Sequence, residues 1–186
     1  MMKMRWDDTL ERFAQDWASG CRHGVRSESQ RSGVGEYVVV GENIYVTTEE
    51  DELPVAAVSS WIAEKDNYDY EGNECRGACG FYQAVVWAET RFLGCGLKYC
   101  PNLQGSPSPG YYVVCDYGPA ADPGDRRPFK KGDPCLDCPE DARDCVHELC
   151  YDQSTWSPGE NLATRLTVNC ITVAVSFLIK VQITFV

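Results

Sequence analysis

Cysteine is the residue type with the strongest chemical signature in this chain. Eleven cysteines occur among 186 residues, namely Cys21, Cys75, Cys79, Cys95, Cys100, Cys115, Cys135, Cys138, Cys145, Cys150 and Cys170. Cysteines at this density typically form a disulfide framework in an oxidising compartment. A reduced, zinc-binding chain is the competing interpretation, and the Cys135-x2-Cys138 spacing keeps it open. The spread of the cysteines along the chain favours disulfides, but their spacing alone does not give the pairing.

The other reactive side chains do not form a recognisable catalytic set. There are two histidines, His23 in a polar loop and His147 among the C-terminal cysteines. No Ser-His-Asp or Cys-His arrangement can be read from the sequence, and cysteines held in disulfides are not nucleophiles. These observations point away from hydrolytic catalysis.

The net charge of the chain is −11. A chain this acidic is a poor candidate for binding nucleic acid or an anionic membrane surface. The basic residues cluster only at Arg126, Arg127, Lys130 and Lys131, which we interpret as a solvated loop.

Three stretches have helical spacing of apolar residues. The first covers residues 7–20, with Asp7 as the predicted N-cap, and the second follows the acidic residues 49–52, with Pro54 in its first turn. The third is the run from Tyr82 to Trp87. The apolar stripes of the first two predict faces packed in a core, and their residues are Leu10, Phe13, Ala14, Trp17 and Ala18, then Val55, Val58, Trp61 and Ile62.

Short β-strands are predicted where alternating or β-branched residues gather. These are Ile44 to Thr48, the stretch from Phe92 to Tyr99, and Tyr111 to Cys115, the last two joined by a Pro/Gly/Ser loop. Residues 22–36 are polar and predict a loop or a frayed helix.

The C-terminal third divides by composition. Residues 119–134 are rich in Pro, Gly and charge and predict a linker, residues 135–150 form a compact cysteine-rich patch, and residues 151–186 form a tail that is apolar from Leu166. The tail has three interpretations, namely a spurious or poorly ordered end, a membrane span or lipid anchor, and a folded strand. Lys180 makes a span costly.

Two separate motifs then carry a resemblance to a known family. The chain reads Cys79-Gly80-Phe81-Tyr82-Gln83-Ala84-Val85-Val86-Trp87, then Gly94-Cys95, then Tyr112-Val113-Val114-Cys115-Asp116-Tyr117-Gly118-Pro119. It resembles the CAP superfamily of cysteine-rich secretory, antigen 5 and pathogenesis-related class 1 proteins, whose pattern is like C-G-H-Y-T-Q-V-V-W, G-C and Y-V-V-C-N-Y-G-P. Gly41-Glu42-Asn43-Ile44 is similar to the family's G-E-N-[IL], and Glu64, three residues after Trp61, fits its W-x-x-E.

The resemblance implies an α+β fold: a three-layer α–β–α sandwich with a small antiparallel sheet, stapled by disulfides, as a CAP domain over residues 1–118. Residues 135–150 resemble the small disulfide hinge of many animal members, including the peptidase-inhibitor and glioma-pathogenesis-related types. The implied pairs are Cys21–Cys100, Cys95–Cys115, Cys75–Cys79, Cys135–Cys145 and Cys138–Cys150, with Cys170 left over.

In this family a central cleft typically carries two histidines and two glutamates, which can hold a divalent ion such as zinc or position a water. Residue by residue, Glu42 and Glu64 match the glutamates, whereas Val25 and Phe81 stand where the histidines would be. Both carboxylates remain and both imidazoles are gone, so we expect no metal, no cofactor and no enzyme. The two glutamates then have a structural role as the favoured interpretation.

The resemblance therefore implies a secreted, monomeric, non-enzymatic protein that binds an extracellular protein partner or a small hydrophobic ligand such as a sterol. The alternatives are a metal-dependent hydrolase or metal-regulated binder that uses the cleft glutamates, and a surface protein tethered by the tail. Residues 1–5 show no signal peptide. Because relatives usually carry another helix before Met4, we expect that an N-terminal part is missing.

Overall fold

A sheet with the strand order β1-β7-β8-β4 forms the middle layer of the structure. This computed structural model describes residues 1–51, 53–106, 109–122, 124 and 126–152, so the predicted tail from Leu166 lies outside the described residues. The strands are β1 (Arg5–Trp6), β7 (Phe92–Cys100), β8 (Gly110–Gly118) and β4 (Gly41–Thr47). The long neighbours β7, β8 and β4 are antiparallel, while the two-residue β1 pairs with β7 in parallel.

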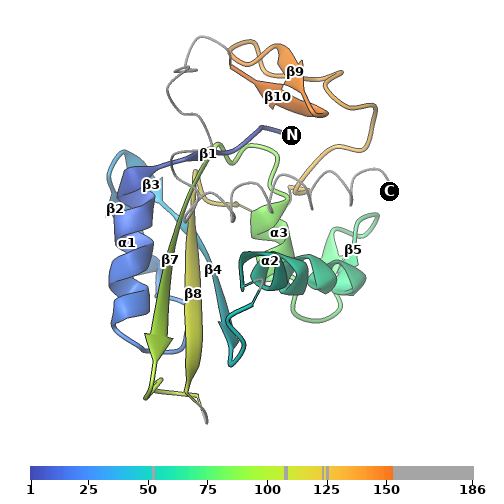
Figure 1. Cartoon of the computed structure of the whole chain (residues 1–186). Coiled ribbons are helices and arrows are strands. Elements are labelled where there is room, and N and C mark those ends of the chain that lie inside the picture. The colour runs from blue at the N-terminus through green and yellow to red at the C-terminus, as the bar shows by residue number, and fades with distance from the viewer. Residues whose placement is uncertain (52, 107–108, 123, 125, 153–186) are drawn as a thin grey trace.

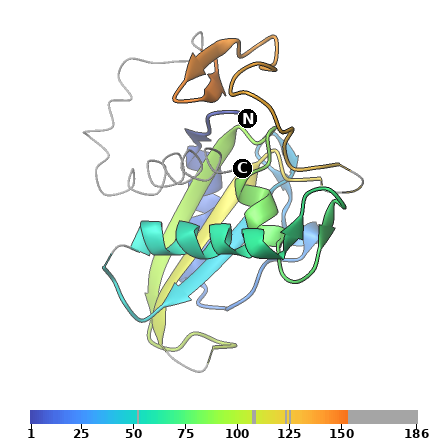
Figure 2. The same ribbon diagram turned by 90° about the vertical axis from the view of Figure 1, so that its right-hand side faces the viewer.

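Helices cover both faces of this sheet, which gives the three-layer sandwich (Figures 1 and 2). Helix α1 (Asp8–Ser19) lies on one side, and α2 (Leu53–Ala63) and α3 (Gly80–Val85) lie on the other. The α+β sandwich implied by the motifs is the observed fold, and all three predicted helices are present. The third begins at Gly80 and ends at Val85, two residues earlier at each end than the apolar run suggested.

Helix α1 starts where the sequence predicts. The Asp7 carboxylate accepts hydrogen bonds from the backbone N–H groups of Thr9 and Leu10, at 2.7 and 2.9 Å, so it satisfies donors that have no partner inside the helix. Leu10, Ala14 and Ala18 are fully buried against the sheet. The helix approaches β7 so closely that a Cβ added at Gly94 would lie 2.1 Å from the backbone nitrogen of Glu11.

The other face of the sheet holds the larger hydrophobic core. Val58 and Trp61 of α2 and Val85 of α3 are almost completely removed from solvent there. The indole N–H of Trp61 donates to the backbone carbonyl of Ile44 in β4 at 2.8 Å, so this large side chain buries its one polar atom with a partner. This packing fixes the start of the short η2 helix (Glu64–Asn67), which carries Glu64.

Two sequence expectations were wrong in detail. The polar stretch 22–36 is neither a plain loop nor a frayed helix, because it contains the 3-10 helix η1 (Glu28–Gln30) and the strand β2 (Ser32–Val34), which pairs with β3 (Tyr37–Val39). The strands β7 and β8 have nine residues each, so they are longer than the apolar runs alone indicated. Pairing of β2 with β3, and of β7 with β8, extends strand structure beyond what the residue types alone indicated.

The last described residues of the chain form a small hairpin above the sandwich (Figure 1). Strands β9 (Asp144–Val146) and β10 (Leu149–Tyr151) form a hairpin, and β10 is tied to the N-terminus because the N–H of Cys150 donates to the carbonyl of Met1 at 2.9 Å. Another small hairpin joins β5 (Tyr68–Asp69) and β6 (Glu74–Cys75) beside α3. The N-terminus and the hairpin β9–β10 lie together in Figure 1.

Five disulfides join ten of the eleven cysteines. They are Cys21–Cys100, Cys75–Cys79, Cys95–Cys115, Cys135–Cys145 and Cys138–Cys150, which are the pairs that the resemblance implies. The sulfur atoms of Cys135, Cys138 and Cys150 lie within 4.8 Å of one another, but all three belong to disulfides and so offer no thiolate to zinc. Cys170 lies outside the described residues.

Candidate functional site

Glu42, the first of the two predicted cleft carboxylates, is bound by an arginine of the same chain. Its Oε1 accepts a hydrogen bond from the backbone N–H of Arg26 at 2.6 Å, and its Oε2 lies 2.7 Å from Nη1 of the Arg26 guanidinium. Arg26 is only 5% exposed and Glu42 only 6%. A charge pair at this depth is stabilising only if the remaining polar atoms are also satisfied.

A second buried carboxylate shares the same guanidinium. Asp116 of β8, which stands opposite Glu42 in the register with β4, accepts from Nη1 of Arg26 with its two oxygens at 3.2 and 3.1 Å. The Nη2 atom of Arg26 donates to the carbonyl of Phe13 in α1 at 2.5 Å, and the guanidinium carbon lies 3.7 Å from the centre of the Phe13 ring. One arginine therefore connects α1, β4 and β8.

The charge in this cluster balances through a proton. Burial raises the pKa of Asp116 to about 8, Arg26 opposes that shift, and the neighbouring Glu42 adds to it. Burial also raises the pKa of Glu42, against the hydrogen bond and the charge of Arg26. Near neutral pH a protonated Asp116 can therefore donate a hydrogen bond to Glu42, whose Oε2 accepts no other hydrogen bond from the described residues. The two carboxyl groups and one guanidinium then carry no net charge.

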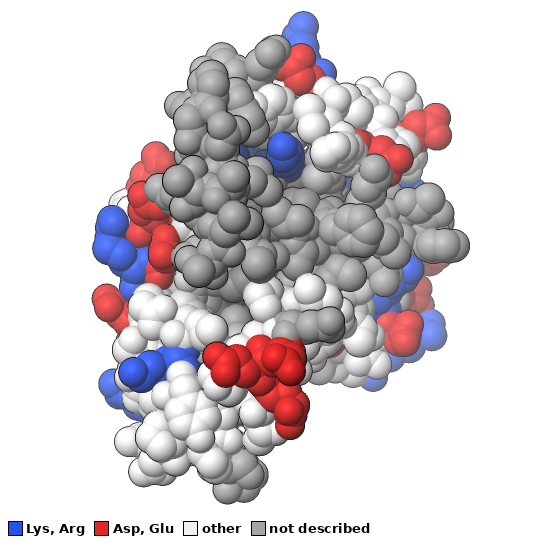
Figure 3. Space-filling view, viewed as in Figure 1, with Lys and Arg blue, Asp and Glu red and all other residues white. Residues whose placement is uncertain are grey.

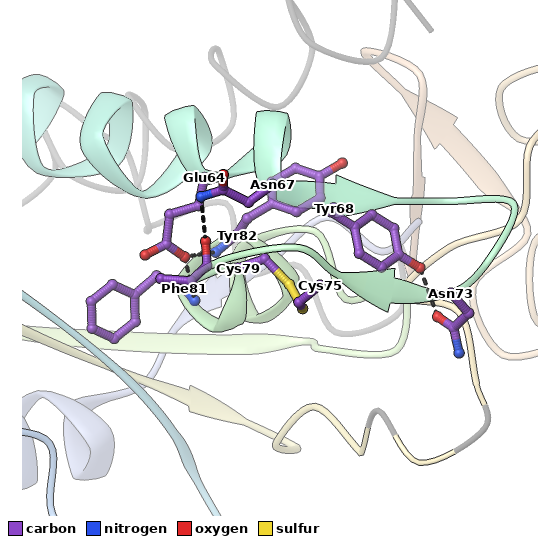
Figure 4. The surroundings of a disulfide bond; sticks show 9 residues. Glu64, Asn67, Tyr68, Asn73, Cys75, Cys79, Phe81 and Tyr82 are labelled. Carbon is purple, nitrogen blue, oxygen red and sulfur yellow. Dashed lines mark hydrogen bonds between the residues drawn. A yellow bond between two sulfur atoms is a disulfide. The ribbon is translucent and has the colours of Figure 1, made fainter.

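Glu64, the second predicted carboxylate, is engaged elsewhere (Figure 4). Its Oε2 accepts hydrogen bonds from the backbone N–H groups of Phe81 and Tyr82, at 2.9 and 3.2 Å. These donors lie in the first turn of α3, where helical N–H groups lack partners within the helix. The Cys75–Cys79 disulfide lies beside this contact, as Figure 4 shows, and closes the loop that leads into α3.

The residues at the two family histidine positions do not reach these carboxylates in a chemically useful way. Val25 is 42% exposed, and Phe81 packs in the hydrophobic core with a side chain that cannot bind metal or move a proton. Of the two histidines, His23 lies beside the Tyr112 ring and His147 occupies the β9–β10 turn.

The donor set therefore does not fit a divalent metal. Zinc sites use several nitrogen, sulfur or oxygen ligands directed at one point. Here both oxygens of Glu42 face Arg26, Glu64 accepts from backbone N–H groups, and the expected imidazoles are absent. The contacts described for Glu42 and Glu64 are with an arginine and with backbone N–H groups, which are contacts of a structural kind.

A cavity lies away from Glu42 and Glu64. It has a volume of about 1000 Å³ and is bounded by α3, the segment 126–134 and the hairpin β9–β10 with its preceding loop. Its apolar lining is Met1, Tyr82, Val86, Trp87, Phe129 and Leu136. Neither Glu42 nor Glu64 lines it, and neither does Val25 or Phe81.

The basic residues predicted as a solvated loop form part of this lining. Arg126 is paired with Glu89, and Lys130 with Asp137 at 2.6 Å. Lys131 lies 4.2 Å from the centre of the Tyr70 ring, and the carbonyl of Phe129 accepts from the Tyr70 hydroxyl at 3.0 Å. The four cations are exposed, as predicted, and the segment that carries them also contacts Tyr70.

Comparison with known proteins identifies the class to which this fold and these motifs belong. Residues 1–117 match the CAP family, described as the cysteine-rich secretory protein family, so this chain belongs to that family. It is similar to glioma pathogenesis-related protein 1 of Mus musculus, with 34% identity over 82% of this chain and 56% of the relative. It is also similar to peptidase inhibitor 16 of the same organism, with 32% identity over 90% of this chain and 32% of the relative.

This chain thus spans 56% and 32% of the lengths of these two relatives. Among solved structures, it resembles NaASP2 with Zn²⁺ at a TM-score of 0.59 and 27% identity, covering 81% of this chain and 76% of that one. None of the helices that the structure describes is both long enough and apolar enough to cross a membrane.

Sequence reasoning identified the glutamates but missed Arg26 and Asp116. One signal was available, because Asp116 stands where the family pattern C-N-Y-G-P has Asn and lies inside the apolar run Tyr111–Cys115 and Tyr117. An acid on a buried strand requires a positive partner. The sequence did not identify that partner, because nothing local distinguishes Arg26 from the other arginines of its loop.

Proposed function

We propose that this chain is a secreted, non-enzymatic CAP-domain protein that binds a small hydrophobic ligand, with a sterol as the first candidate. The cavity of about 1000 Å³ is the observation that carries this proposal. Ligand pockets have volumes of about 300–1,000 Å³ and combine apolar walls with a few polar groups. The cavity offers Val86, Phe129 and Leu136 as apolar wall, with Lys65 and Arg127 as polar groups at its edge.

Several features support the rest of the proposal. The five disulfides are typical of a protein folded in an oxidising compartment, which agrees with secretion. The relatives carry the names of an inhibitor and a pathogenesis-related protein rather than of an enzyme. We also retain as a proposal the division into a CAP domain over residues 1–118, a linker over 119–134 and a hinge over 135–150.

A sterol-binding titration on disulfide-intact protein tests the ligand. The matched variants are Leu136→Asp, which changes the cavity wall, and Val38→Asp, which changes a site outside the cavity, since these side chains are 79% and 84% exposed. We expect saturable micromolar binding that Leu136→Asp weakens about tenfold, the effect of losing roughly 1.4 kcal/mol of apolar contact. Val38→Asp should bind as the unaltered protein does. Absence of binding by folded protein would refute the ligand proposal.

Recognition of an extracellular protein is the second candidate, and the name of one relative favours it. Peptidase inhibitor 16 is 32% identical to this chain over 90% of it. Capture of one extracellular partner by the immobilised chain, with no sterol bound, would support this candidate. The same immobilised protein after reduction of its disulfides is the control, because a specific partner should not bind the unfolded chain.

A further inference from the structure

The buried cluster around Arg26 bears on whether this chain depends on metal, a question separate from the ligand proposed above. We propose that Arg26 is a built-in cation: its guanidinium engages Glu42 and Asp116, joins α1, β4 and β8, and excludes divalent metal ions from Glu42. The solved structure of NaASP2 with Zn²⁺ shares this fold at a TM-score of 0.59. In this chain the guanidinium takes over the carboxylate that the family set would offer to an ion.

Arg26 donates through its backbone N–H and through both terminal nitrogens of its guanidinium. The backbone N–H of Arg26 contacts Glu42 at 2.6 Å, and Nη1 of Arg26 contacts it at 2.7 Å. Asp116 is reached by Nη1 at 3.1 Å, and the carbonyl of Phe13 by Nη2 at 2.5 Å. The flat face of the guanidinium stacks on the Phe13 ring, a geometry suited to arginine but not to a hydrated ion.

A metal ion would have to displace this guanidinium. Arginine cannot lose its proton in a protein, so its positive charge would remain next to the incoming ion. Arg26 is also pinned through its backbone, because its carbonyl accepts from Nε of Arg31 at 3.1 Å, and Nη1 of Arg31 in turn donates to the carbonyl of Val40 at 2.6 Å. These backbone contacts hold the loop in place, and moving the side chain out would break its contacts with Glu42, Asp116 and the Phe13 carbonyl.

Asp116 adds a second buried acid to the pair formed by Arg26 and Glu42. Asp116 stands where the family pattern has Asn, so this chain carries one more buried acid than the pattern requires. Loss of Arg26 would leave both acids buried without a cation, which would be destabilising. Together Arg26 and Asp116 join β8 to the loop in front of η1, as their 3.1 Å contact indicates.

Zinc calorimetry and thermal unfolding of the unaltered, disulfide-intact protein test this proposal first. We expect no saturable Zn²⁺ binding that depends on Glu42, and the same Tm with and without EDTA. Zn²⁺ binding that is lost in Glu42→Gln but kept when His23 and His147 are both replaced by Ala would overturn the proposal. Zn²⁺ binding that is kept in Glu42→Gln but lost when both histidines are replaced would place the metal on the surface histidines and leave Glu42 without metal, as proposed.

Substitution of Arg26 gives the second test. Arg26→Met keeps an unbranched apolar stem but removes the guanidinium and its charge, and we expect its Tm to fall by roughly 10 °C. The matched control is Lys130→Met, because Lys130 is a surface residue paired with Asp137 at 2.6 Å, and its Tm should stay unchanged. An Arg26→Met protein with the Tm of the control would overturn the proposal. If this variant fails to fold, the zinc and EDTA measurements, which leave Arg26 intact, still decide the question.

Discussion

Gly94 and Gly96 of β7 permit a close approach of helix α1 to the sheet, and replacing either should separate them. A Cβ on Gly94 would lie 2.1 Å from the backbone nitrogen of Glu11 and 2.4 Å from the carbonyl carbon of Leu10. A Cβ on Gly96 would lie 2.4 Å from the Cα of Gln15. These neighbours are helix backbone, which cannot rotate away as a flexible side chain would.

The size of the effect follows from these distances. Because an ordinary contact needs at least 3.4 Å, α1 must move away from β7 by about 1 Å to accept one methyl group at Gly94. Overpacking of this kind costs about 1–3 kcal/mol, and the rigid neighbour places Gly94→Ala near the upper end. The movement would also draw the Phe13 carbonyl away from Nη2 of Arg26, so the buried charge cluster would lose a hydrogen bond.

Urea unfolding of the oxidised protein, followed by tryptophan fluorescence, measures this cost. We expect Gly94→Ala to lose about 3 kcal/mol of unfolding free energy with an unchanged m-value. Gly80→Ala is the matched control, because a Cβ there meets nothing within 4 Å and the position is helical, so it should gain roughly 0.5 kcal/mol. If Gly94→Ala and Gly80→Ala unfolded at the same urea concentration, the close contact between α1 and β7 would be refuted.

Three further predictions concern pH, disulfides and the helix cap. The folded-state pKa of Asp116 is raised to about 8, so its contribution to stability is complete below pH ~4 and is lost as the pH rises toward 8. The loss should reach up to about 1.4 kcal/mol of unfolding free energy per pH unit. Urea titrations between those pH values should show a smaller slope for Asp116→Asn than for the unaltered protein. Removing Cys21–Cys100, with a separation of 79 residues, should cost about 4 kcal/mol against about 3 kcal/mol for Cys135–Cys145, with a separation of 10, in matched serine pairs; equal losses would contradict the loop-entropy argument. Asp7→Ala should lower the free energy of unfolding by about 1–2 kcal/mol, because the first turn of α1 loses its cap and the Tyr37 hydroxyl loses an acceptor at 3.0 Å. A loss below about 0.3 kcal/mol in urea unfolding, which is what a residue without a capping role would give, would contradict this prediction.

Local sequence signals predicted the parts of the fold that local chemistry controls. Asp7 caps α1 because its side chain reaches N–H groups two and three residues later, and such a contact depends only on neighbouring residues. The three helices follow from apolar spacing in the same way. The three-layer arrangement came from the family resemblance, because the pattern alone predicts only a cross-linked mixture of helices and strands.

Contacts between distant segments were not predictable in this way. Pairing of Arg5–Trp6 with β7 joins residues that are far apart in the sequence, and the two-residue strand has no alternation to reveal it. The four basic residues around Arg126 are exposed, as their polar composition predicts, but composition does not show which side chains they contact. In the structure these cations contact Trp87 and Tyr70, and the apolar stems of such side chains readily cover aromatic surface.

The candidate site illustrates why matched motifs do not by themselves fix chemistry. Glu42 and Glu64 were found by their motifs, yet their contacts give each a different task, since one holds a buried guanidinium and the other caps α3. A carboxylate is a metal ligand, a proton carrier or a structural acceptor according to which donors face it. In this chain the donors are an arginine and two backbone N–H groups, so the same residues that could serve an ion in another member hold this fold together.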